Sequence, residues 1–92
     1  MIVSFYAMLR DKVGSRQVDF DLPPGYTLRQ LVEDLVKRYP ALRDEMLDAQ
    51  GNLYGHIHIF VNGRDSTFLD GSLDASLKPE DTISIFPPVG GG

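Results

Sequence analysis

The sequence contains no cysteine among its 92 residues. Disulfide bonds, thiolate metal sites, and a cysteine nucleophile or persulfide belonging to this chain are therefore excluded. Any sulfur chemistry in which the protein takes part must use sulfur that another molecule supplies. Because no covalent cross-link is available, the fold must be held by a hydrophobic core, and a single domain of this length can bury enough surface for that.

Positive charge is also scarce, since nine Lys and Arg residues stand against 13 Asp and Glu residues, which gives a net charge of -4. A surface of this sign repels a phosphate backbone, so a basic protein face is expected as a partner and nucleic acid is not. No apolar run approaches the length of a membrane span, and the opening MIVSFYAML has no basic leader or cleavage signal. We therefore expect no membrane association and a cytoplasmic location.

Hydrophobic periodicity predicts several short strands. Alternating apolar residues place them at residues 2–8, 17–22, 56–61, 64–68 and around 83–85. The first strand is expected to direct Val3, Phe5 and Ala7 to one face, and residues 10–15 have the composition of a turn. Asn62-Gly63 is a strong hairpin signal between the third and fourth strands.

One main helix is predicted after the second strand. Thr27 and Gln30 match a capping box, and Pro40 places the end of the helix near residue 38 or 39. A single apolar stripe with helical spacing is formed by Leu28, Leu31, Val32, Leu35 and Val36. A second, short helical turn is expected at 41–47, followed by a loop.

This order of elements predicts an α+β fold in one domain. One helix with one apolar stripe covers one face of one sheet, so we expect a single mixed sheet of about five strands wrapped across that helix. If the first and last strands are adjacent, this is the ubiquitin-like β-grasp arrangement. The expected domain spans residues 1–88, and residues 89–92 are expected to form a flexible, protruding Gly-Gly tail.

The chain ends in ISIFPPVGGG. Pro87 and Pro88 donate no ladder hydrogen bond and favour an extended exit from the last strand. Fully extended, residues 89–92 reach roughly 13 to 14 Å. Glycines without Cβ atoms can thread a narrow channel, so the sequence Val89, Gly90, Gly91, Gly92 is suited to entering another protein's active site. A disordered terminus without function is the common alternative for glycine-rich ends.

Four segments of the chain carry a resemblance to a known family. They are FYAMLRDKVG, GYTLRQLVEDLVKRYPALRDEM, HIFVNGRD and LKPEDTISIFPPVGGG, and together they cover nearly the whole length. In these segments the chain resembles the MoaD/ThiS family of ubiquitin-like sulfur carriers, which includes the small subunit of molybdopterin synthase. The specific part is the free Gly-Gly end after an apolar strand and a proline-containing exit.

The resemblance implies a carrier protein without an active site or a bound cofactor of its own. Gly92 would be adenylated with ATP by an enzyme of the ubiquitin-activating type and converted to a thiocarboxylate with sulfur from a donor protein. The expected acceptor is the large subunit of molybdopterin synthase. The longer middle region, residues 42–55, resembles variants that serve cysteine synthesis, RNA thiolation or protein modification, and conjugation of Gly92 to lysines is an alternative.

Phe60 and Phe86 have the parity that directs them away from the helix-covered face. Exposed aromatic residues often mark partner surfaces, so both are candidate partner-binding residues, with burial under the middle loop as the alternative. His56 and His58 are interpreted as surface residues and not as zinc ligands, since no third ligand is near. The carboxylates of Asp44, Glu45 and Asp48 are interpreted as a solvated face without hydrolytic function.

Overall fold

The structure is a computed structural model that describes residues 1–87. The expected tail, residues 89–92, and Pro88 lie outside the described residues. The helices and strands, in chain order, are β1 (Ile2–Phe5), α1 (Met8–Val13), β2 (Gln17–Asp19), α2 (Leu28–Arg38), α3 (Arg43–Met46), β3 (His58–Val61), β4 (Arg64–Asp65) and β5 (Thr82–Phe86). No helix in the described part of the chain is long and apolar enough to span a membrane.

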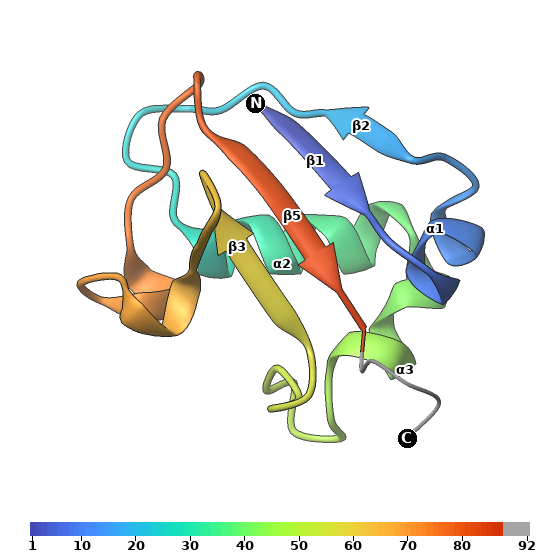
Figure 1. Cartoon of the computed structure of the whole chain (residues 1–92). Helices are drawn as coiled ribbons and strands as arrows, with labels where there is room; N and C mark the ends of the chain where they lie inside the picture. The colour runs from blue at the N-terminus through green and yellow to red at the C-terminus, as the bar shows by residue number, and fades with distance from the viewer. Residues whose placement is uncertain (88–92) are drawn as a thin grey trace.

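The strands form one five-stranded mixed sheet in the order β2-β1-β5-β3-β4. The last strand, β5, lies at the centre of the sheet, parallel to β1 and antiparallel to β3. In Figure 1 this sheet lies in front of α2, which crosses behind it. The predicted α+β architecture, with one mixed sheet on one main helix, is confirmed, and it is the β-grasp fold.

The predicted start and end of α2 are confirmed. The Thr27 hydroxyl accepts a hydrogen bond from the Gln30 backbone N–H at 3.2 Å, and the Gln30 side chain accepts one from the Thr27 N–H at 2.8 Å. This capping box satisfies amides that the first helical turn leaves without partners. The helix ends at Arg38, immediately before the C-cap Tyr39 and Pro40.

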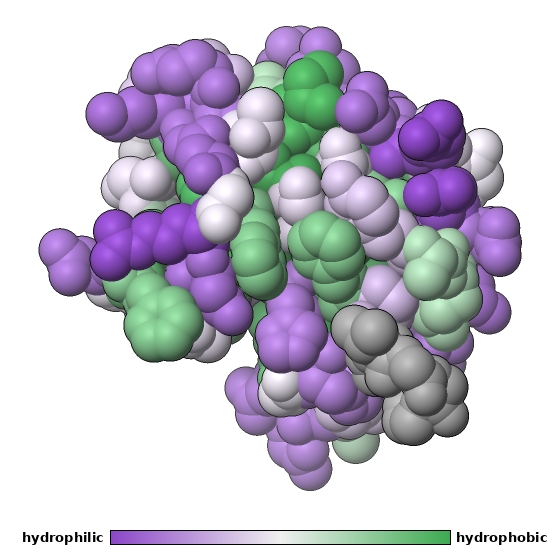
Figure 2. All heavy atoms as spheres, viewed as in Figure 1, coloured by the Kyte–Doolittle hydropathy of each residue, from purple (hydrophilic) through white to green (hydrophobic). Residues whose placement is uncertain are grey.

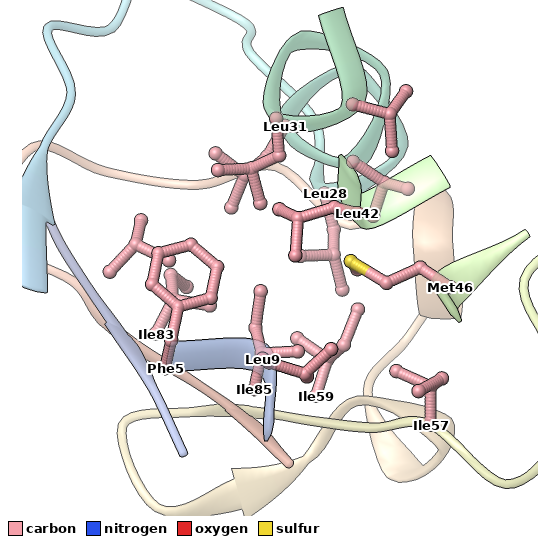
Figure 3. Packing of buried hydrophobic residues seen from close by; sticks show 14 of the residues in the cluster. Phe5, Leu9, Leu28, Leu31, Leu42, Met46, Ile57, Ile59, Ile83 and Ile85 are labelled. Carbon is pink, nitrogen blue, oxygen red and sulfur yellow. The ribbon is translucent and has the colours of Figure 1, made fainter. Parts of the chain in front are cut away.

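The core lies between α2 and the face of the sheet that the helix covers (Figure 3). The five residues of the predicted α2 stripe are all buried. They meet Val3 and Phe5 from β1, Ile59 from β3, and Ile83 and Ile85 from β5. Leu9 on α1 and Met46 on α3 are also fully buried, so the two short helices close this core beyond α2.

The first predicted strand, 2–8, is too long. β1 stops at Phe5, and Ala7 has a positive φ of 53°, which is uncommon for a residue with a Cβ atom and turns the chain into α1. Ala7 is therefore exposed and does not share the inward face with Val3 and Phe5. The predicted turn at 10–15 is partly helical, because α1 continues to Val13.

Three other predicted strands are also shorter than expected, and the third begins at His58 instead of residue 56. β2 ends at Asp19 instead of residue 22, although Phe20 still donates a backbone hydrogen bond to the Met1 carbonyl. The fourth strand covers only Arg64 and Asp65, and residues 66–68 form a single turn of 3-10 helix. The Asp65 carboxylate accepts hydrogen bonds from the Thr67 N–H and hydroxyl, both at 2.9 Å, and this capping ends the strand.

The predicted hairpin between β3 and β4 is confirmed. Asn62 and Gly63 both have positive φ, at 52° and 83°, which is the requirement of the type I′ turn. The Asn62 side chain also binds the start of β5, because its carbonyl accepts from the Thr82 N–H at 2.9 Å. The hairpin is thereby fastened to the central strand.

The middle region folds as a short helical turn and a compact loop. The predicted turn at 41–47 is present as a 3-10 turn, Pro40–Leu42, followed by α3. After it, Leu47 and Leu53 form an isolated antiparallel bridge. The Asp48 carboxylate closes the loop between them by accepting hydrogen bonds from two backbone N–H groups.

Candidate functional site

Three aromatic rings form a row on the face of the sheet opposite α2. The rings of Tyr6 and Phe86 are stacked, with centroids 4.3 Å apart and an interplanar angle of 13°. Phe60 meets Phe86 edge to face at a centroid distance of 5.4 Å. Figure 2, which looks onto this face, shows apolar side chains gathered over β3 and β5 with polar side chains around them. We call Tyr6, Phe86 and Phe60 the aromatic row.

Strand pairing builds this row. Alternation along β5 sends Ile83 and Ile85 into the core and Phe86 to the opposite face. Tyr6 continues the register of β1, since its N–H donates to the Ile85 carbonyl at 3.3 Å. Phe60 and Phe86 are both half-buried and contact aromatic neighbours on the face of the sheet opposite α2. Neither residue belongs to the hydrophobic core.

The row lies where the chain leaves the sheet. Phe86 is the last residue of β5, and Pro87 follows it in a buried position. Pro87 is therefore packed into the domain, and it is the last of the described residues. Among the predicted site residues, Phe60, Phe86 and Pro87 are thus placed together, whereas Pro88, Val89, Gly90, Gly91 and Gly92 lie outside the described residues.

A titratable pair borders the row. His58 is the cross-strand partner of Phe86, and its Nδ1 is 3.9 Å from the Asp65 carboxylate. The pKa of Asp65 is lowered, first by the hydrogen bonds from the Thr67 N–H and hydroxyl and to a smaller extent by His58. Hydrogen bonds that stabilise the charged form favour the ionised carboxylate. A protein that covers Phe86 therefore also meets the imidazole and the carboxylate beside it.

The other exposed aromatic residue, Phe68, is isolated. Its side chain is 72% exposed, and within residues 1–87 its ring stacks on no other ring. Its carbonyl accepts a hydrogen bond from the Arg64 guanidinium at 3.2 Å. Phe68 is therefore a surface residue of the 3-10 turn and is separate from the aromatic row.

Two surface hollows lie beside the middle region in the described part of the chain. The two hollows measure about 280 and 300 Å³ and share Leu53 and Leu73 in their walls. Within residues 1–87, no three His, Asp or Glu side chains are grouped to hold a metal ion. Asp44 is exposed, and Glu45 lies 3.8 Å from Lys12, so these carboxylates form part of a solvated face.

Sequence reasoning missed Tyr6 as a member of this site. The signal was available in the alternation of β1, because a strand that buries Val3 and Phe5 directs Ile2, Ser4 and the following tyrosine outward. The stacking of Tyr6 on Phe86 depends on the parallel pairing of β1 with β5, and that pairing is a property of the folded sheet.

The fold is that of the ubiquitin-like carriers and modifiers. The chain belongs to the ThiS family, whose model matches residues 3–92. It is a small, non-catalytic protein of the carrier or modifier kind.

The similar proteins are of two described kinds, a small modifier protein and a sulfur carrier protein. Small archaeal modifier protein 3 of Haloferax volcanii is 31% identical over 96% of this chain and 94% of its own length. A putative sulfur carrier protein of Archaeoglobus fulgidus is 35% identical over 72% of this chain and 74% of its own length.

Two solved structures show the same fold. The crystal structure of SAMP1 from Haloferax volcanii has a TM-score of 0.87 and 32% identity, with 100% of this chain and 98% of that chain covered. The CysO protein of Amycolatopsis orientalis, solved in complex with BexX, has a TM-score of 0.80 and 29% identity, with 99% and 98% covered. In that relative, the carrier fold is seen with a protein partner.

Proposed function

We propose that this chain is a sulfur carrier whose C-terminal Gly92 is activated by an enzyme of the ubiquitin-activating type. A carboxylate at neutral pH is a poor electrophile, so one of its oxygens first attacks the α-phosphorus of ATP and pyrophosphate leaves. A sulfur nucleophile then attacks the acyl carbon of the adenylate, and AMP leaves. When the sulfur arrives as a persulfide on a donor protein, a second thiol cleaves the resulting acyl disulfide and releases the thiocarboxylate.

The observation that carries this proposal is the aromatic row at the end of β5. Exposed aromatic side chains that gather into one patch favour a protein interface over isolated surface exposure. The patch lies immediately before the chain enters PPVGGG, so an enzyme that covers Phe86 also receives the residues that follow it. We therefore assign Phe86, Phe60 and Tyr6 to docking, residues 1–88 to the domain and residues 89–92 to the reactive tail.

The tail is suited to this role by its composition. Val89 to Gly92 span roughly 13 to 14 Å when extended, which is enough to reach into an active site from a docked domain. Gly91 and Gly92 enter the narrowest part of such a channel, and Pro87, Pro88 and Gly90 guide the exit from β5. This chain binds no cofactor in the proposal, and ATP is held by the activating enzyme in the cytoplasm.

For the destination of the sulfur we propose molybdopterin synthesis, with the large subunit of molybdopterin synthase as the acceptor. Support comes from the likeness of the chain, over nearly its whole length, to the family that contains the small subunit of that enzyme. The second candidate is conjugation, in which the adenylate of Gly92 is passed on and finally attacked by a lysine amine. It is favoured by the similarity to small archaeal modifier proteins over almost the full chain.

The test is intact mass spectrometry after incubation with the activating enzyme of the same organism, ATP and a sulfur donor. We expect the mass change of one oxygen replaced by one sulfur, located at Gly92 by fragmentation. A chain ending at Gly90 is the matched control and should stay unchanged. If the native chain also stays unchanged while a related carrier is converted by its own enzyme, the sulfur-carrier proposal is wrong. Isopeptide-linked peptides ending in Gly92 would instead support conjugation.

A further inference from the structure

A small basic hollow opens beside the aromatic row. It measures about 50 Å³ and is lined by Ser4, Phe5, Tyr6, Arg10, Arg16 and Gln17. Tyr6 belongs both to this hollow and to the aromatic row. The hollow therefore lies next to the surface that we assign to docking.

Arg10, which lines this hollow, has an incompletely satisfied guanidinium. Its Nε is buried and has no hydrogen-bond partner among residues 1–87. An arginine stays charged at every physiological pH and has only donors to offer, so a buried N–H without an acceptor is unfavourable. A hydrogen-bond acceptor with negative charge would satisfy this N–H group and balance the charge of the guanidinium.

The neighbouring polar groups do not supply this acceptor. The Gln17 side-chain amide donates to the Ser4 hydroxyl at 3.3 Å, so these two groups already bind each other. Arg16 is held beside β1 because its carbonyl accepts from the Phe5 N–H at 2.9 Å, and its side chain adds a second positive charge. No ion pair within residues 1–87 involves Arg10 or Arg16.

We propose that this hollow receives a carboxylate side chain of the protein that covers the aromatic row. Each guanidinium group matches the planar, bidentate geometry of a carboxylate, and the two residues bring positive charge to one hollow on a chain with a net charge of -4. The rings supply apolar contact, which tolerates rotation of the partner, and the ion pair fixes its orientation. Arg10 and Arg16 are thus specificity-determining residues of the docking surface. The inference deepens the proposed function, on which it rests for the identity of the partner.

The first test asks whether the hollow accepts a carboxylate at all. The probe is sodium acetate, titrated into the isotopically labelled full chain at constant ionic strength with chloride as the matched anion, while the Nε–Hε signal of Arg10 is followed by NMR. We expect a saturable shift with acetate, none with chloride, and a weaker response in Arg16→Gln. A chain in which acetate leaves the Arg10 signal unmoved has no such site, and the inference is wrong.

The second test measures binding to the activating enzyme by calorimetry. We expect R10Q/R16Q to bind about tenfold more weakly or worse, with a smaller dependence of Kd on salt. R43Q/K78Q is the control, because it also removes two positive charges, both from exposed positions, and its Kd should stay within about twofold of the native value. Arg10→Lys keeps the charge without the planar fork and should recover only part of the affinity. Circular dichroism melts of all variants exclude unfolding as the cause.

The two tests separate the possible failures. If acetate binds but R10Q/R16Q and R43Q/K78Q have the same affinity for the enzyme, the hollow is only a site for a free anion and the docking role is wrong. If acetate shifts Arg10 only after residues 89–92 are removed, the occupant is the carboxylate at the chain's own end, and the inference is again wrong. If acetate binds while Gly92 is never adenylated, the proposed function fails and the carboxylate site stands.

Discussion

Replacing Phe86 by Ala tests the aromatic row as both a packing and a docking feature. Phe86 makes two ring contacts, at centroid distances of 4.3 and 5.4 Å, and each aromatic pair is worth about 0.5–1.5 kcal/mol. We therefore expect the free energy of unfolding to fall by about 1–3 kcal/mol. Because central aromatic residues of interfaces cost about 2 kcal/mol or more on truncation, kcat/KM for adenylation should fall by about thirtyfold or more.

The assays are urea denaturation and pyrophosphate exchange with the activating enzyme. Phe68→Ala is the matched control, since Phe68 is exposed and has no ring partner among residues 1–87, and it should change stability by less than about 0.5 kcal/mol. A double-mutant cycle of Phe86 with Tyr6 should give a coupling energy of about 0.5–1.5 kcal/mol. Equal stability losses in Phe86→Ala and Phe68→Ala would refute the packing argument, and unchanged adenylation would refute the docking argument.

Three further predictions test the core, the terminus and the acid side of stability. Leu31→Ala should lower the free energy of unfolding by about 2–5 kcal/mol, because Leu31 is fully buried between α2 and the sheet; a neutral urea titration would contradict this packing. Removing Gly91 and Gly92 should abolish adenylation without lowering the Tm, since the core formed by the described residues ends at Ile85, and a large fall in Tm would show that the end contributes to the fold. The folded pKa of Asp65 is lowered, so its ionised form adds stability above the unfolded pKa of about 4, and this is lost as the pH falls through the folded pKa. Asp65→Asn should therefore reduce the acid-induced fall in unfolding free energy measured by urea titrations at decreasing pH, and an unchanged fall would contradict the assignment.

The sequence was sufficient where a structure is determined by neighbouring residues. The capping box of Thr27 and Gln30, the apolar stripe of α2 and the turn at Asn62-Gly63 each depend on residues within a few positions of one another, and each was predicted correctly. Alternation also separated Ile85 from Phe86 on the two faces of β5. These local rules predicted the elements of the β-grasp fold, and the pairing of the first strand with the last was added as a condition.

The errors occurred where side chains or distant strands decide the structure. The end of β1 is determined by the positive φ of Ala7, for which an alanine gives no local signal. The fourth strand ended early because the Asp65 carboxylate binds Thr67 and favours a 3-10 turn. Tyr6 and Arg10 become part of the candidate surface only through the register of β1 with β5 and the position of α1, which adjacent residues do not specify.

The central position of β5 has a mechanical consequence for a carrier that is held by its end. Any tension applied beyond Pro87 is transmitted along β5, which is hydrogen-bonded to β1 on one side and to β3 on the other. Ladder hydrogen bonds run across the strands, so a pull along the strand axis loads both ladders together in shear, and the bonds do not open one after another. A partner enzyme can therefore pull on the terminus with considerable force before the domain unfolds.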